Sequence, residues 1–343
     1  MTPHDLVPRS LCGDLVFRPL GISSGTSRWG PSSRCINDGR LLDGLRRAVE
    51  SGVDLVDTAD FYGSGHAERL IGKVLREFPG HTVQVAGKVG HVRGSASHPY
   101  AGCRLRHQLE QTLENLYLDA LAVYTLDSYD FGLGDQHLDP VIEQLQAMRD
   151  LRQIRAVGLR GPDSRDSARH IRRFRELFDR IRPDVVWTQA SGLLPLAILE
   201  DGEDLGAFTA RHGVGLVVAS PLAHGALVGG CPARALAALE GRALADADAA
   251  AMVIDRGLAE LSLRFGGAPS SLVRLALRFT LQAASHAVVV VGVGDERQVE
   301  QYFSCLAGPL SDEELAEVQE VFTRIRIGLQ DRAGGVPVAG VNV

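Results

Sequence analysis

Short aliphatic runs alternate along this chain with longer stretches in which apolar residues recur at helical spacing. Residues 53–57 form a run typical of a strand, and residues 66–78 place Leu70, Ile71, Val74 and Leu75 on one face of a helix. The same pattern predicts strands at residues 20–23, 53–57, 82–88, 121–126, 154–159, 184–189, 215–219 and 287–291. It predicts helices at residues 66–78, 104–116, 140–151, 164–181, 204–211 and 271–282.

Strands that alternate with helices favour a parallel sheet, and eight strands favour an α/β fold of the closed (β/α)8 TIM barrel type. A doubly wound sheet fits less well, because no G-x-G-x-x-G sequence follows the first strand. Residues 1–343 are therefore expected to form a single domain. Within it, the Ala- and Gly-rich residues 224–256 are expected to form a long, partly helical loop or lid, and residues 311–343 a C-terminal helix and tail.

Composition narrows the classes of function. A net charge of −6 and the absence of any basic run argue against a nucleic-acid partner. The longest apolar run, residues 287–291, is far too short to span a membrane, and residues 1–10 lack the apolar core of a signal peptide. Five scattered cysteines without C-x-x-C spacing indicate reduced thiols rather than a metal site. We therefore expect a cytoplasmic protein with a small-molecule substrate and no metal, and the sequence leaves the oligomeric state open.

In a barrel of this kind the chemistry lies at the C-terminal ends of the strands. Lysine is rare in the chain: only Lys73 and Lys88 occur among 36 basic residues, and Lys, unlike Arg, can release its proton. The strand ends present six candidate residues: Asp57, Lys88, Asp127, Arg160, Gln189 and Ser220.

Tyr62, Lys88 and Asp57 can together form an acid/base centre. A Lys88 cation would lower the pKa of the Tyr62 phenol from about 10, and Asp57 would hold Lys88 in place. Tyr62 would then act as a general acid or base toward a carbonyl oxygen. The spacing is equally consistent with a structural Asp57–Lys88 ion pair against which Tyr62 merely packs.

Residues 52–63, together with Glu68, Gly72 and Leu75, resemble the signature of the aldo-keto reductases. Weaker similarities follow in the same order along nearly the whole chain, at residues 109–116, 154–158, 220–227 and 291–292. The resemblance implies a (β/α)8 barrel, a nicotinamide cofactor and a catalytic tetrad. Asp57, Tyr62 and Lys88 match three members of that tetrad.

The fourth member of the tetrad departs from the family. The family has a histidine at the end of strand four, and this chain has Asp127 there. An acidic residue at this place resembles the steroid double-bond reductases of the family, in which a protonated carboxyl group polarises an enone carbonyl. Alternatively Asp127 pairs with a cation, and Arg160 at the next strand end is the expected partner.

The cofactor pocket also departs from the family. The Ser-Asn pair that holds the nicotinamide carboxamide corresponds to Arg160 and Gly161, a glutamine corresponds to Trp187, and the stacking tyrosine corresponds to Ala219. Losing these hydrogen bonds and the stack predicts nicotinamide affinity about one to three orders of magnitude weaker, or lost.

The resemblance still implies cofactor contacts at eight positions: Ser24, Gln189, Ser191, Ser220, Leu222, Gly292, Arg297 and Gln301. It places the substrate near Trp29, His91, Arg160 and Trp187, and His91 could take over a proton transfer.

Three classes of function follow. The first is reduction of a carbonyl or a conjugated C=C bond of a small polar molecule by NADP(H) or NAD(H), with Tyr62 as general acid and Asp127 as a modified partner of the carbonyl oxygen. The second is a cofactor-independent lyase, dehydratase or isomerase that uses Tyr62, Lys88 and Asp57 with Asp127 in a pocket that no longer holds nicotinamide. The third is a non-catalytic binding role, because this barrel hosts many functions.

Overall fold

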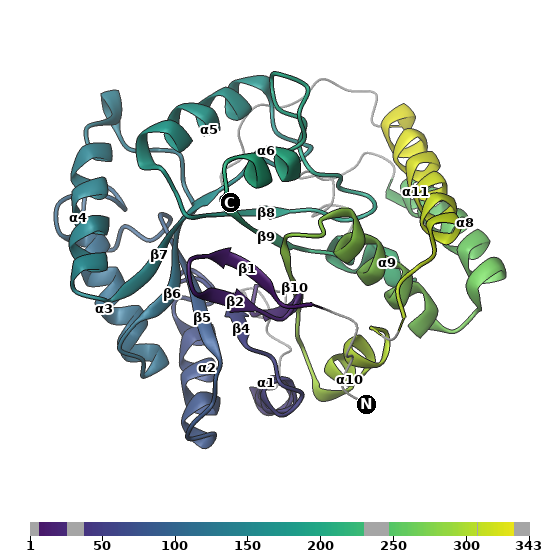
Figure 1. Ribbon diagram of the computed structural model, residues 1–343, viewed down its shortest axis with the longest axis horizontal. Coiled ribbons are helices and arrows are strands. Elements are labelled where there is room, and N and C mark those ends of the chain that lie inside the picture. The colour runs from purple at the N-terminus through teal and green to yellow at the C-terminus, as the bar shows by residue number, and fades with distance from the viewer. Residues whose placement is uncertain (1–6, 26–37, 230–246, 307, 333–343) are drawn as a thin grey trace.

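A computed structural model of the protein describes residues 7–25, 38–229, 247–306 and 308–332. Eight parallel strands close into a barrel in the order β10-β3-β4-β5-β6-β7-β8-β9. Helices surround the barrel on the outside (Figure 1). The expected single-domain (β/α)8 barrel is confirmed.

The expected strands and helices are all present, with ends that differ by a few residues, as is usual for element boundaries. The barrel strands are β3 (Leu20–Ser23), β4 (Leu55–Asp57), β5 (Gln84–Val89), β6 (Leu121–Leu126), β7 (Ile154–Arg160), β8 (Val185–Gln189), β9 (Gly215–Ala219) and β10 (Val288–Gly292). The helices are α1 (Asp38–Glu50), α2 (His66–Glu77), α3 (Arg104–Leu116), α4 (Leu138–Asp150), α5 (Ala168–Ile181), α6 (Leu205–Arg211), α8 (Ala247–Phe265), α9 (Pro269–Ala283), α10 (Glu296–Ser304) and α11 (Asp312–Arg332).

Local chemistry explains where the outer helices begin and which face they bury. α5 starts after Ser167, whose side chain accepts a hydrogen bond from the backbone N–H of His170. Its buried residues recur at helical spacing and pack toward the barrel: Phe174, Leu177, Phe178 and Ile181. α6 begins in the same way after Asp204, which accepts from the N–H of Ala207.

Alternation along the strands decides which residues reach the barrel interior. One buried layer is formed by inward residues that include Leu55, Ala86, Val123, Ala156, Val185, Val217 and Val288. Side chains two positions further along the same strands face inward again, nearer the C-terminal mouth: Asp57, Lys88, Thr125, Trp187 and Ala219. This alternation places polar and charged groups at the mouth, above an apolar core.

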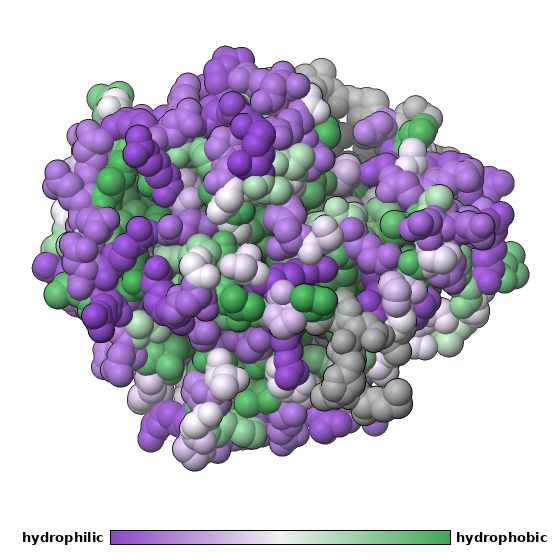
Figure 2. Space-filling view, viewed as in Figure 1, coloured by the Kyte–Doolittle hydropathy of each residue, from purple (hydrophilic) through white to green (hydrophobic). Residues whose placement is uncertain are grey.

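An antiparallel hairpin closes the opposite end of the barrel, and the sequence pattern did not predict it. It consists of β1 (Arg9–Cys12) and β2 (Leu15–Phe17), and it lies across the centre of the view in Figure 1. Leu11, Leu15 and Phe17 are buried in the inner core of the barrel. Figure 2 shows the same side of the molecule, where hydrophilic residues cover most of the surface over the outer helices.

The segment 224–256 was expected to form a long loop that is partly helical. It begins within the 3-10 turn η2 (Ala223–Val228) and ends inside α8, while residues 230–246 lie outside the described residues. The C-terminal helix is present as α11. None of the described helices is long and apolar enough to cross a membrane.

Candidate active site

Lys88 is held by Asp57 at the mouth of the barrel. Its Nζ donates to Asp57 Oδ1 at 2.6 Å and to the carbonyl oxygen of Thr58 at 2.9 Å. The side chains of Lys88 and Asp57 are each 1% exposed. Ser23, the last residue of β3, donates to the other carboxylate oxygen of Asp57 at 2.8 Å. Sequence reasoning missed Ser23, although its place at a strand end was a signal for it.

Tyr62 lies beside this pair, with Lys88 Nζ 5.1 Å from the centroid of its ring. The Tyr62 hydroxyl lies so close to Gly25 that a Cβ on that glycine would overlap it, so the position requires a residue without a side chain. Burial, followed by the charges of Asp57 and Asp127, raises the pKa of Tyr62 well above its ordinary value. The expected net lowering of this pKa is therefore not found, because burial outweighs the effect of the neighbouring cations.

Asp127 pairs with His91, and the expected ion pair with Arg160 is not formed. His91 Nε2 lies 2.8 Å from Asp127 Oδ2, and the ring of Phe61 packs edge-on against the imidazole at 4.6 Å. Asp127 is buried, whereas the His91 side chain is 34% exposed. The loop after β5 thus brings a histidine beside Asp127, the residue that follows β6.

Arg160 points into the mouth without contacting Asp127 directly. It is the last residue of β7 and lies four positions after the inward-facing Ala156. Burial alone would lower the pKa of its guanidinium, but the surrounding acids, Asp127 first, outweigh burial and raise it. The two side chains are therefore neighbours rather than a hydrogen-bonded pair.

Trp187 and Asp127 offer polar atoms that have no partner within the described part of the chain. Trp187 Nε1, a donor, and Asp127 Oδ1, an acceptor, are both buried without a hydrogen bond. Lys88 Nζ lies 4.8 Å from the centroid of the Trp187 ring. A primary amide needs one donor and one acceptor, so these residues fit a nicotinamide carboxamide, although they differ from the family's set. The buried Ala219 supplies no ring for stacking.

Other predicted cofactor residues near the strand ends already have hydrogen-bond partners. Ser24 Oγ donates to Thr58 Oγ1 at 2.9 Å. Gln189 Oε1 lies 3.3 Å from Arg165 Nη2 and 3.1 Å from His224 Nε2. Burial, followed by the charge of Arg165, lowers the pKa of His224 to about 4, so this imidazole is neutral.

The remaining predicted contacts are spread over three places. Ser220 and Leu222 follow β9, where Ser220 has a left-handed backbone with φ 62°. Gly292 ends β10, and Arg297 and Gln301 lie on α10, where Arg297 is exposed. Trp29 lies outside the described residues.

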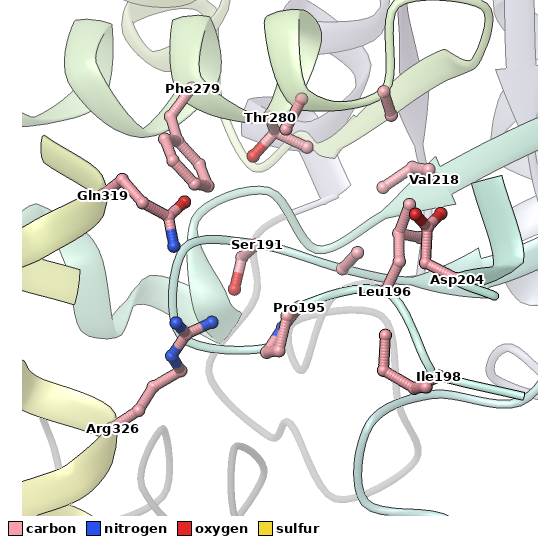
Figure 3. Close-up of a pocket in the computed structure, with 13 residues that line it drawn as sticks. Ser191, Pro195, Leu196, Ile198, Asp204, Val218, Phe279, Thr280, Gln319 and Arg326 are labelled. Atoms are coloured by element: carbon pink, nitrogen blue, oxygen red, sulfur yellow. The ribbon is translucent and has the colours of Figure 1, made fainter. Parts of the chain in front are cut away.

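Ser191 lies away from the mouth, in a cavity of about 240 Å³ between the loop after β8, α9 and α11. Its hydroxyl accepts hydrogen bonds from the N–H groups of Leu193 and Leu194. Figure 3 shows Arg326 of α11 directed toward the loop that carries Ser191. None of the residues proposed for catalysis lines this cavity.

Asp60 is a buried acid that the motif contains and that sequence reasoning did not single out. It is 2% exposed, and neither carboxyl oxygen has a hydrogen-bond partner among the described residues. Burial, followed by the charge of Glu68, raises the pKa of Asp60 to about 7. Across the described ranges, no group of three or more His, Cys, Asp or Glu side chains is arranged to hold a metal ion.

Comparison with known proteins places this barrel in a family. The sequence model of the Aldo/keto reductase family matches residues 21–322. This chain belongs to the aldo-keto reductase family. Members of the family that it resembles are dehydrogenases and reductases, and the chain is 25% identical to L-galactose dehydrogenase of Arabidopsis thaliana over 324 residues, which cover 92% of this chain and 94% of the relative.

Solved aldo-keto reductases share the fold. The holo form of an aldo-keto reductase from Bacillus halodurans, AKR11C1, superposes with a TM-score of 0.68 at 23% identity, covering 92% of this chain and 96% of that one. An aldo/keto reductase of Klebsiella pneumoniae, solved in complex with NADP and acetate, superposes with a TM-score of 0.63 at 18% identity, covering 92% and 95%.

Proposed function

We propose that this aldo-keto reductase reduces a carbonyl group of a small polar molecule with a nicotinamide cofactor, and that Tyr62 donates the proton to the carbonyl oxygen. The observation that carries the proposal is the cluster in which Lys88, bound to Asp57 at 2.6 Å, lies against the Tyr62 ring. A relative whose name gives a sugar as its substrate, L-galactose dehydrogenase, supports a small polar substrate.

The protonation state of Tyr62 favours reduction over proton abstraction. Because burial holds its pKa well above the ordinary value, the phenol is neutral across the physiological range and carries a proton to donate. The tyrosinate that forms as the proton leaves lies near the Lys88 cation, which stabilises it. Asp57 and the carbonyl of Thr58 keep Lys88 in position for this task.

His91 and Asp127 take the place of the family's histidine in this proposal. Asp127 accepts from Nε2, and Nδ1 forms no hydrogen bond with the described residues, so Nδ1 is the nitrogen that remains to face a substrate oxygen. An Asp127 that is bound to His91 is poorly placed to act as the free carboxylic acid of a double-bond reductase, so we favour the carbonyl as the reduced group.

A bound nicotinamide would supply the hydride that forms the new C–H bond. Trp187 Nε1 and Asp127 Oδ1 are the atoms that would hold its carboxamide. NADP(H) and NAD(H) are both compatible with the residues present. Because Ala219 supplies no ring for stacking, we expect a larger dissociation constant for nicotinamide than in family members that have the stacking tyrosine.

Two measurements test this function. Titration with NADPH and with NADH, followed by nicotinamide fluorescence, is expected to reveal binding of at least one below millimolar concentration. Tyr62→Phe is expected to lower kcat for carbonyl reduction by more than about a hundredfold, the contribution of a general acid, without changing the dissociation constant of the cofactor. Tyr117→Phe, at an exposed tyrosine on the outside of the barrel, is the matched control.

Two outcomes would contradict the proposal. An unchanged rate in Tyr62→Phe would remove Tyr62 from the chemistry. Absence of nicotinamide binding up to millimolar concentration, together with turnover of a hydroxylated substrate without cofactor, would favour the cofactor-independent lyase or isomerase instead.

A further inference from the structure

We propose that the carbonyl compound this site reduces also carries a carboxylate, and that the Arg160 guanidinium binds it. The inference rests on the function proposed above and names the class of substrate: oxo acids and aldehyde acids rather than neutral aldehydes or ketones.

The position of Arg160 brings it to the reacting end of the barrel. Its backbone lies opposite Trp187 in the β7–β8 register, and its other neighbour across the sheet is Asp127, which follows the Leu126–Leu159 pair. Its side chain faces the barrel interior, as that of Ala156 does, because the two residues are four positions apart on the same strand. The charge of Arg160 also acts on the pKa of Tyr62, which it lowers, so the guanidinium is within electrostatic reach of the phenol.

Three other basic residues near the mouth, Lys88, His91 and Arg165, are already paired. Asp57 neutralises Lys88, and Asp127 is bound by His91. Arg165, on the following loop, is bound by Asp163 at 2.6 Å. Arg160, in contrast, forms no ion pair within 4.0 Å and no side-chain hydrogen bond with the residues that the structure describes. The backbone carbonyl of Arg160 accepts a hydrogen bond from the Tyr129 hydroxyl at 2.6 Å.

A half-buried guanidinium with its donors free favours an anion in the pocket. Removing a cation from water is unfavourable unless an acceptor replaces the lost hydration, and a planar guanidinium binds a carboxylate through two parallel hydrogen bonds. A carboxylate, with one negative charge, matches a single free guanidinium. A phosphate ester would bring about two charges, and Lys88 is not free to balance the second because Asp57 binds it.

A matched pair of aldehydes tests the inference. 4-Carboxybenzaldehyde and 4-nitrobenzaldehyde have similar size and shape, but only the first carries a negative charge. Their different intrinsic reactivity cancels when the same ratio is compared between variants. The measured quantity is the ratio of kcat/KM for the carboxylate over the nitro compound. Arg160→Met keeps an unbranched apolar stem and removes the charge, and it is expected to lower this ratio about 10- to 100-fold, the range for a charge-assisted hydrogen-bonded pair. Arg160→Lys, which keeps the charge and loses the planar fork, is expected to recover part of the ratio.

Arg172→Met provides the matched control, because Arg172 is an exposed α5 residue that pairs with Glu200. It should leave the ratio unchanged. An Arg160→Met variant with an unchanged ratio would overturn the inference, while Tyr62-dependent turnover of both aldehydes would still support the proposed function. If the wild type reduces neither aldehyde, the proposed function fails for these compounds and the anion site is decided by binding.

The binding measurement uses Trp187 as its reporter. The chain has only two tryptophans, so Trp29→Phe leaves Trp187, opposite Arg160, as the single one. Quenching of its fluorescence by benzoate, with benzamide as the neutral comparison, is expected to give a dissociation constant for benzoate that rises at least about tenfold when Arg160→Met is added. Equal benzoate affinity in both proteins would overturn the anion site without reference to turnover.

Discussion

At the scale of single residues, the least expected feature is an acid with no hydrogen-bond partner in the described part of the chain. Asp60 lies within the motif that carries Asp57 and Tyr62, yet its two carboxyl oxygens are buried without hydrogen bonds. Burial and the nearby Glu68 disfavour its ionised form and raise its pKa to about 7. An unfolded chain ionises the same group near about pH 4. The folded protein therefore binds a proton here that the unfolded chain has lost.

The sign of the pH dependence follows from that difference. Between about pH 4 and pH 7 the folded state holds more protons than the unfolded state, so this residue lowers the free energy of unfolding as pH rises, by about 1.4 kcal/mol per unit. Asp60→Asn cannot ionise, so its advantage in stability over the wild type is expected to grow by about 1 to 3 kcal/mol from pH 5 to pH 8. Urea unfolding across this pH range measures it, and Asp119→Asn, at an exposed position, is the control. A difference independent of pH would contradict the assignment.

At the scale of elements, the loop after β5 decides where His91 stands. Tyr100, fully buried, has its hydroxyl within hydrogen-bond distance of the carbonyl oxygens of Val89 and Ser128, and its ring stacks on Phe131 at 4.7 Å. Gly90, just before His91, has φ 128°, and a Cβ there would overlap the Tyr100 hydroxyl. The first turn of the loop is therefore tightly constrained.

Gly90→Ala is expected to disturb this turn and so misplace His91. Overlap in a packed region costs about 1 to 3 kcal/mol, and a displacement of catalytic groups by about 1 Å can lower a rate about a hundredfold. Gly80→Ala is the matched control, because Gly80 also has positive φ but nothing lies near its added Cβ. Urea unfolding and kcat/KM are compared for the two variants, and equal effects on both would show that the loop does not position His91.

The elements also show how far the sequence could predict this protein. Most of the eight barrel strands were predictable because they are compact aliphatic runs that alternate with helical patterns. The β1–β2 hairpin was missed because its two strands have only four and three residues, although the Gly13-Asp14 pair that joins them is a turn sequence. The pairing of Lys88 with Asp57 was predictable from adjacent strand ends. The His91–Asp127 pair was not predictable, because it depends on how an irregular loop folds back over the mouth.

At the scale of the whole molecule, the two ends of the barrel differ in the kind of side chain that they contain. The C-terminal mouth holds the charged and polar groups of the candidate site, and the β1–β2 hairpin fills the other end with apolar side chains. Barrels of this type commonly separate chemistry from stability in this way. The separation can be measured here, because Phe17 and Val16 are neighbours in β2 that face opposite directions, with exposures of 1% and 47%.

Phe17→Ala is expected to lower the free energy of unfolding by about 3 to 5 kcal/mol, since it leaves a cavity in the inner core of the barrel. Val16→Ala removes a largely exposed side chain and is expected to change it by no more than about 0.5 kcal/mol. Urea unfolding measures both values, and kcat is measured at a temperature where each variant remains folded. Because Phe17 lies at the end of the barrel away from Tyr62 and Lys88, kcat should stay within about twofold of the wild type at that temperature, as the separation of stability from chemistry in such barrels implies. A folded Phe17→Ala protein with a kcat reduced about tenfold would show instead that packing at the closed end reaches the catalytic groups through the layers of the barrel core.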